Sequence, residues 1–85
     1  MRQHYRHSVE SDFGDGLSYV EILDGRPVRQ IEVCGSTWYW GDASHPEHLS
    51  VRPFAELGLR REHAISAEEF ERVWAEALHR RPPRP

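Results

Sequence analysis

The stretch His45–His48, which reads His-Pro-Glu-His, has the residue types that come closest to a metal site in this chain. Two imidazoles three positions apart, with Glu47 between them and Asp42 nearby, offer the nitrogen and oxygen ligands that zinc accepts. A structural zinc site takes four ligands and usually includes cysteine pairs, whereas this chain has one cysteine. Pro46 favours a loop, so we expect these histidines to face water. A metal site is the weaker alternative, and its candidate ligands are His45, His48 and Asp42.

A catalytic set is harder to find than a metal site. Cys34 ends an apolar stretch, where a cysteine behaves as a small hydrophobic residue, and the sequence shows no helix start or fixed cation beside it that would activate the thiol. The grouped carboxylates Glu68, Glu69 and Glu71 stand at the start of a helix, where capping and solvation account for them. We therefore expect no catalytic residue and no cofactor.

The aromatic run Trp38-Tyr39-Trp40 allows two interpretations. In a strand, alternation puts the two tryptophans on one face and Tyr39 on the other. Packing in the core beneath a helix is the favoured interpretation of the tryptophan pair. The alternative is an exposed aromatic patch beside acidic residues, which is typical of a protein-binding hot spot. The candidate binding residues are Trp38, Tyr39, Trp40, Tyr19, Glu21 and Arg29.

The charge distribution argues against nucleic acid as the partner. The 85 residues carry a formal net charge of −3, and all 11 basic residues are arginine. They are dispersed, apart from Arg60-Arg61 and the segment 80–85, so no basic patch of the kind that binds phosphates is evident. Residues 8–25 hold no arginine and five acids. An acidic face of this kind favours a basic protein partner.

Length and hydropathy predict one cytoplasmic domain. A chain of 85 residues makes a single domain, which we place at residues 1–80, followed by an Arg/Pro-rich tail at 81–85. The N-terminal residues lack the apolar core of a signal peptide, and no run approaches the roughly 20 apolar residues of a membrane helix. A lone cysteine fits a reducing compartment. We expect neither a membrane nor a nucleic acid as partner.

Three strands are predicted beyond a polar N-terminal one. Residues 4–11 alternate, with Tyr5, His7 and Val9 on one face, and residues 12–16 have the composition of a turn. Residues 17–23 and 28–34 are rich in β-branched and apolar side chains, and residues 37–40 form a third short strand.

The loop at 24–27 leaves two registers open for the central hairpin. Asp24-Gly25 is a strong hairpin signal. A loop of two or four residues puts Val20, Ile22, Ile31 and Val33 together with Arg29 among them. A loop of three residues instead sets Glu21 opposite Arg29 and Tyr19 opposite Ile31, which pairs opposite charges across the strands.

The last element is a helix with clear boundaries. Ser66 and Glu69 form a capping box, and Ile65 and Phe70 have hydrophobic-staple spacing. Pro82-Pro83 ends the helix. Its apolar stripe has helical spacing, and we expect Trp74 to be the central anchor. The stripe comprises Phe70, Val73, Trp74, Ala77 and Leu78. A short helix is also expected at 54–57, between Pro53 and Gly58. The predicted fold is α+β: a small antiparallel sheet of three to four strands with the C-terminal helix packed on one face.

Several of these motifs resemble a group of small bacterial domains of unknown function. The matching stretches are Tyr-x-Glu-Ile at 19–22, Arg-x-Ile-Glu-Val at 29–33 and Ile-Ser-x-Glu-Glu-Phe-Glu-x-Val-Trp at 65–74. The chain lacks the longer loop found in such domains before the last helix. The resemblance implies no established activity. It implies the register with Glu21 opposite Arg29, and some of these domains look like immunity or antitoxin-type partners by size and acidity.

We interpret the sequence as a protein-binding module of the immunity or inhibitor type that blocks a basic partner. The small size of the chain, its acidic first half and aromatic residues that could be exposed at the surface favour this interpretation. A homodimer formed through a sheet edge or the tryptophan face is compatible with this interpretation. The alternative is a small enzyme or metal-binding protein built around the His45–His48 loop.

Overall fold

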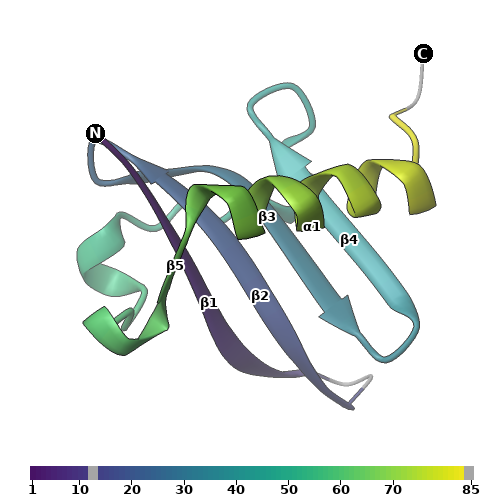
Figure 1. The fold of residues 1–85 in the computed structure, drawn as a ribbon, viewed down its shortest axis with the longest axis horizontal. Helices are drawn as coiled ribbons and strands as arrows, with labels where there is room; N and C mark the ends of the chain where they lie inside the picture. The colour runs from purple at the N-terminus through teal and green to yellow at the C-terminus, as the bar shows by residue number, and fades with distance from the viewer. Residues whose placement is uncertain (12–13, 84–85) are drawn as a thin grey trace.

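A twisted antiparallel sheet, crossed on one face by a long helix, makes up the computed structural model, which describes residues 1–11 and 14–83 (Figure 1). The strands run in the spatial order β4-β3-β2-β1-β5. Their bounds are β1 Arg2–Ser11, β2 Gly14–Leu23, β3 Arg26–Cys34, β4 Thr37–Asp42 and β5 Ala64–Ile65, and the helix α1 is Ala67–Arg80. The α+β class and the helix on one face are confirmed. The sheet has five strands, not three to four, because the two-residue β5 joins the edge of β1 and is too short to show a pattern.

The N-terminal hairpin of β1 and β2 disperses the acidic residues of the first half. Glu10 lies opposite Asp15 near one end of the hairpin, and Asp24 lies in the turn at the other end. Glu21 points into the protein and is 1% exposed. Residues 14–16 of the predicted turn at 12–16 belong to β2, which begins at Gly14; Asp12 and Phe13 lie outside the described residues. The acids described here therefore do not form a single acidic face.

The central hairpin combines a tight turn with a bulge. Asp24 and Gly25 both have positive φ, 51° and 80°, as a two-residue turn of the primed kind requires, and Leu23 pairs with Arg26. The register then shifts between Glu21 and Ile22, so that Glu21 lies opposite Arg29. The charge-paired register is thus confirmed, but a two-residue turn plus one extra residue in β3 produces it, not a three-residue loop.

The helix α1 begins where the sequence predicts. The Ser66 hydroxyl accepts a hydrogen bond of 3.0 Å from the Glu69 N–H, which satisfies one of the unpaired donors of the first turn. Phe70 and Ala77 are both 0% exposed, whereas Trp74 is only half-buried. The expectation that Trp74 is the central anchor is wrong: Phe70 contacts His4 of β1 and Arg29 of β3 and so lies over the middle of the sheet, while Trp74 packs against Trp40 of the edge strand β4.

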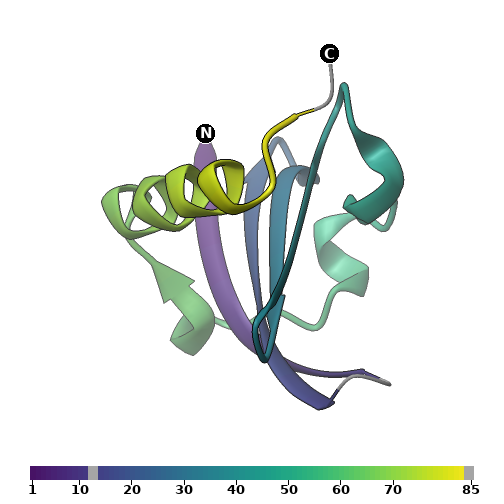
Figure 2. The same ribbon diagram turned by 90° about the vertical axis from the view of Figure 1, so that its right-hand side faces the viewer.

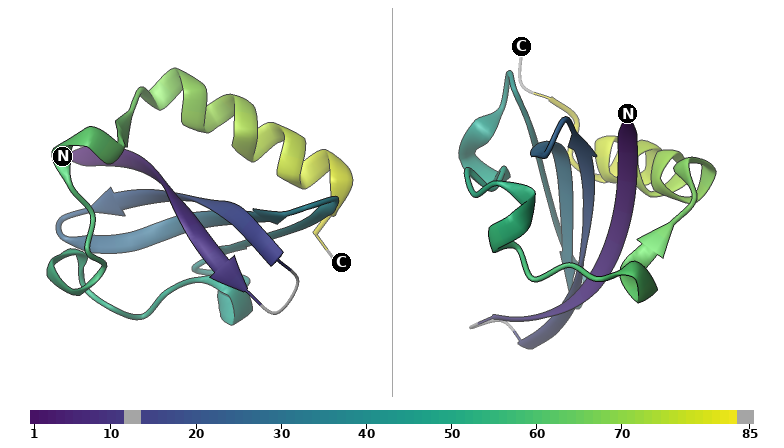
Figure 3. Two further views of the ribbon diagram at one scale, coloured as in Figure 1. Left: turned by 90° about the horizontal axis from the view of Figure 1, so that it is seen from below. Right: turned by 90° about the vertical axis from the view of Figure 1, so that its left-hand side faces the viewer.

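The two faces of the sheet carry separate hydrophobic clusters, so the protein has three layers (Figures 2 and 3). The helix-side cluster includes Ile31, Trp40, Phe70 and Ala77. The loop-side cluster consists of Tyr5, Val20 and Ile22 under Phe54, Leu57 and Leu59.

The segment that covers the loop side holds three 3-10 turns: η1 Pro46–His48, η2 Phe54–Glu56 and η3 Arg61–His63. The expected short helix at 54–57 is thus a single 3-10 turn, and it precedes Gly58 with its φ of 68°. Throughout the described residues, no helix is both long enough and apolar enough to span a bilayer.

Candidate functional site

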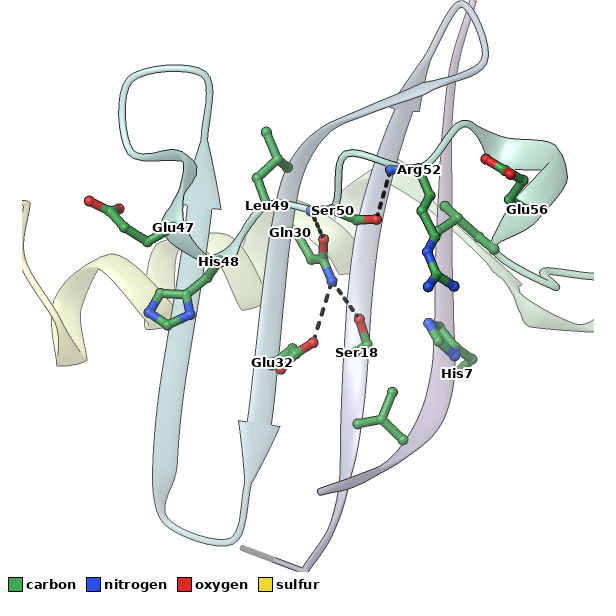
Figure 4. Close-up of a pocket in the computed structure, with 12 residues that line it drawn as sticks. His7, Ser18, Gln30, Glu32, Glu47, His48, Leu49, Ser50, Arg52 and Glu56 are labelled. Carbon is green, nitrogen blue, oxygen red and sulfur yellow. Dashed lines mark hydrogen bonds between the residues drawn. The ribbon is translucent and has the colours of Figure 1, made fainter. Parts of the chain in front are cut away.

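The loop-side face of the sheet is only partly covered, and the uncovered part forms a polar hollow that we name the trough (Figure 4). The antiparallel register aligns His7, Ser18 and Glu32 in one row across β1, β2 and β3. The loop after β4 supplies the opposite wall. The hollow has a volume of about 450 Å³. Its lining comprises His7, Val9, Ser18, Gln30, Glu32, Glu47, His48, Leu49, Ser50, Arg52, Glu56 and Leu57.

The side chain of Gln30 lies at the floor of the trough. Its amide oxygen Oε1 accepts a hydrogen bond of 2.8 Å from the main-chain N–H of Ser50, which ties the loop to the sheet. Its amide donates to the Ser18 hydroxyl at 3.4 Å and to the Glu32 carboxylate at 3.5 Å (Figure 4). Both of these bonds are long, so the Glu32 oxygens keep most of their capacity to accept hydrogen bonds.

The charges that line the trough are not neutralised by ion pairs. Glu32, Glu47 and Glu56 face a single guanidinium, that of Arg52. No ion pair within the described part of the chain involves any of these four groups. The pKa of His7 is lowered from 6.5, first by burial and then by the neighbouring charge of His63, so His7 is neutral at pH 7. The trough therefore carries a surplus of negative charge.

A second hollow, the aromatic groove, adjoins the trough at the edge strand β4. Its volume is about 420 Å³, and it shares Glu47 and His48 with the trough. The ring of His48 lies 4.6 Å from that of Tyr39, and the ring of His45 meets Trp40 edge-on at 4.9 Å. The lining of the groove comprises Tyr39, Trp40, His45, Glu47, His48, Arg81, Pro82 and Pro83.

The C-terminal segment forms one wall of the aromatic groove and contacts β4 at two points. The indole N–H of Trp40 donates a hydrogen bond of 2.7 Å to the Arg81 carbonyl. The Arg81 guanidinium lies over the Tyr39 ring, 4.8 Å from its centre. Arg80 similarly lies 4.8 Å from the centre of the Trp38 ring. The aromatic run of β4 thus receives the end of α1.

The six predicted binding residues do not form one surface. Trp40 is 9% exposed and its ring belongs to the helix-side cluster; Glu21 is 1% exposed, and Tyr19 packs against the same cluster. Tyr39 lies on the opposite face of β4, in the groove. The favoured core interpretation therefore holds for the Trp40 ring, because the helix covers that face, while its N–H reaches the groove.

Glu21 and Arg29 instead form a buried ion cluster beneath α1. Arg29 donates two hydrogen bonds of 2.8 Å to the two Glu21 oxygens and also pairs with Glu71. His4 and Arg2 contact the same carboxylate at 2.8 Å and 3.2 Å. The Arg29 hydrogen bonds hold the pKa of Glu21 at about 2, and those to Glu21 raise the pKa of Arg29. With the carboxylate buried and fully bonded, this cluster serves the fold.

The metal alternative gains no support from the geometry. His45 Nδ1 contacts Asp42 Oδ1 at 3.0 Å, while His48 faces Tyr39, so the predicted ligands do not converge. Within residues 1–11 and 14–83, no group of three or more His, Cys, Asp or Glu side chains is placed to hold a metal ion. Cys34 is buried at the end of β3.

Sequence reasoning missed the polar floor of the trough. In β3, alternation places Gln30 and Glu32 on the face opposite Arg29 and Ile31. That pattern could have flagged a polar sheet face that no helix covers. No local sequence pattern indicates that Arg81 contacts β4, because its partners Tyr39 and Trp40 lie about 40 positions earlier in the chain.

Comparison of the chain with protein-family models, with curated proteins and with solved structures finds no match. The resemblance to small bacterial domains of unknown function therefore stays a prediction.

Proposed function

We propose that this protein is a binding module that takes up an extended, basic segment of a partner protein in the trough and the adjoining aromatic groove. One observation carries the proposal: Glu32 lies opposite Tyr39 across β3 and β4, Glu47 lines both hollows, and no ion pair among the described residues involves either carboxylate. A carboxylate beside an aromatic face is the environment in which an arginine gains both an ion pair and a stacking contact.

Size and shape support a protein segment over a small molecule as the ligand. The two hollows measure about 450 Å³ and about 420 Å³ and join at Glu47 and His48. Together they follow the surface from β1 to the edge strand β4, a path suited to several residues of extended chain. Each hollow carries one arginine, Arg52 in the trough and Arg81 in the groove.

An inhibitor or immunity role follows naturally from such a site. A protein of this size that covers a basic segment of its partner blocks that segment from other ligands. The hydrogen bond between Ser50 and Gln30 ties the loop wall of the trough to the sheet, so the site is formed before the partner arrives.

The test is the binding of a fluorescent peptide of alternating arginine and glycine, measured by anisotropy at two salt concentrations. We expect binding that weakens with salt, and a loss of at least about fivefold in affinity for Glu32→Gln. The matched control is Glu68→Gln, which removes the same charge from the exposed start of α1, on the other side of the sheet. Equal losses in the two variants would show a nonspecific effect of net charge and would refute the proposal.

A further inference from the structure

We infer that the C-terminal segment Arg81–Pro83 is an internal pseudo-ligand, and that the aromatic groove recognises an Arg-Pro-Pro type of segment in its partner. The inference rests on the proposed function and names the ligand class and the regulation of that site. The segment covers the Tyr39 ring and the Trp40 N–H, which are the groups that the partner's segment would contact.

The contacts of Arg81 are those by which aromatic grooves bind proline-rich segments. The Trp40 indole donates to a main-chain carbonyl directly before a proline, at 2.7 Å, and a planar cation lies over Tyr39 at 4.8 Å. Proline-rich segments bind in aromatic-lined grooves because their extended shape is already fixed and costs little entropy to order.

The neighbouring prolines continue this chemistry within the groove. Pro82 and Pro83 line it together with Tyr39 and His45. Proline fixes φ and keeps the preceding residue out of the helical region, so α1 ends at Arg80 and the chain runs on extended past the groove. Arg81 has φ −134° and ψ 82°, outside the helical range.

The placement of Trp40 shows that the groove needs an acceptor. Its ring is fixed in the helix-side cluster, against Trp74 and His45, so the N–H has a set direction. A buried indole N–H without an acceptor is costly, and the Arg81 carbonyl satisfies it here. A partner's carbonyl that displaces Arg81 satisfies the same donor, so the exchange conserves this hydrogen bond.

The strength of the internal contact can be bounded from its tethering. A segment joined to the end of α1 has an effective concentration on the order of millimolar at the groove. For a separate peptide of the same sequence with a Kd near 100 μM, a millimolar competitor lowers apparent affinity about tenfold. The segment therefore weakens the binding of every partner by this factor, and only a partner with higher affinity displaces it.

The experiment compares the binding affinities of the full chain and of a chain that ends at Arg80. The proline peptide is a labelled peptide of residues 80–85, Arg-Arg-Pro-Pro-Arg-Pro. The alanine peptide has the same charge and carries alanine in place of each proline. We expect the shortened chain to bind the proline peptide about tenfold more tightly than the full chain does, and more tightly than it binds the alanine peptide. Trp40→Phe keeps a ring in the core but removes the N–H, and we expect it to abolish the difference between the two peptides.

A second full-length variant guards against misfolding of the shortened chain. Arg81→Ala with Pro82→Ala and Pro83→Ala keeps the chain length, and we expect it to bind the proline peptide as the shortened chain does. Equal affinity of full and shortened chains, or equal affinity for the two peptides, overturns the inference while leaving the proposed function standing. If neither the arginine-glycine peptide nor the proline and alanine peptides bind to any variant, both the inference and the proposed function are overturned. A dimer that the shortening abolishes would show that the segment occupies a second copy, and would overturn the internal contact.

Discussion

The guanidinium of Arg29 holds the carboxylate of Glu21 through two parallel hydrogen bonds, each 2.8 Å long, beneath the helix α1. The bulge in the central hairpin makes this pairing possible, because it brings the two residues opposite each other on the helix side. Arg29 also lies 5.0 Å from the ring centres of Phe70 and Trp74. One arginine thus joins the sheet, the buried acid and the helix, and the stability of the protein should depend on it.

Acid should unfold the protein through Glu21. Its pKa falls from 4.5 to about 2, chiefly because of the Arg29 hydrogen bonds. A depressed folded-state pKa means that the stabilisation is complete above pH 4.5 and is lost as the pH falls toward 2. We expect Glu21→Gln to lose about 3 kcal/mol of unfolding free energy at pH 7. We also expect the unfolding free energy of this variant to change less with pH below pH 4.5 than that of the parent chain. Urea unfolding between pH 7 and pH 2 measures both.

The control for this pair is Glu71→Gln. Glu71 contacts Arg29 from the exposed side of α1. Its loss should cost less than about 1 kcal/mol, as is usual for exposed ion pairs. A larger loss for the Glu71 variant than for the Glu21 variant would place the stabilising pair at the helix surface and contradict the prediction.

Phe70, not Trp74, should be the most sensitive position of α1. Phe70→Ala removes a side chain that is 0% exposed, and we expect a loss of about 3–5 kcal/mol. Trp74→Ala truncates a half-buried ring at the edge of the helix-side cluster and should cost less. Thermal or urea unfolding of the two variants ranks them directly; the reverse order would restore Trp74 as the anchor.

The contribution of the N-terminal cap of α1 to stability can be tested by removing one oxygen atom, the hydroxyl of Ser66. Ser66→Ala removes the acceptor for the Glu69 N–H, and the expected loss is about 1 kcal/mol. Ser66→Asn keeps a capping acceptor and should remain within about 0.5 kcal/mol of the parent chain. Equal losses for both variants would mean that the serine acts through something other than its cap.

Gly41 controls how closely the loop after β4 approaches the sheet. A Cβ at this position would lie 2.8 Å from the main-chain carbon of His48 and 2.8 Å from the nitrogen of Leu49. We expect Gly41→Ala to push the loop away, cost about 1–3 kcal/mol and disturb the His48–Tyr39 ring contact. NMR shifts of the His48 ring report this. Gly35→Ala is the control, since its Cβ meets open space and its cost is only that of a φ of 62°.

His7 should titrate below the usual value for histidine. Burial is the main cause of its lowered pKa, and the charge of His63 is the second. Because the unfolded chain takes up this proton more readily, stability should fall as the pH drops through 6.5 toward the folded-state pKa. An NMR titration of the ring measures the midpoint. His63→Gln should shift that midpoint upward, and an unchanged value would rule out the contribution of His63.

The parts of the fold that the sequence predicts are those fixed by local chemistry. The cap at Ser66, the Asp24-Gly25 turn and the facing charges of Glu21 and Arg29 each act over a few residues or across one hairpin. The two-residue strand β5 gives no periodicity to detect. The trough depends on where the loop after β4 lies over the sheet, and the groove depends on Arg81 returning to β4, so neither follows from local pattern.

The sheet separates two hydrophobic clusters, and this separation makes the protein a convenient scaffold for engineering. The two clusters have no described residue in common, so the costs in free energy of substitutions in opposite clusters should add. The exposed positions of the loop between β4 and β5 can then be randomised to create new binding specificities, while Phe54, Leu57 and Leu59 keep the loop-side cluster and α1 keeps the other. The same independence would let gene duplicates diversify these exposed positions while both clusters stay unchanged.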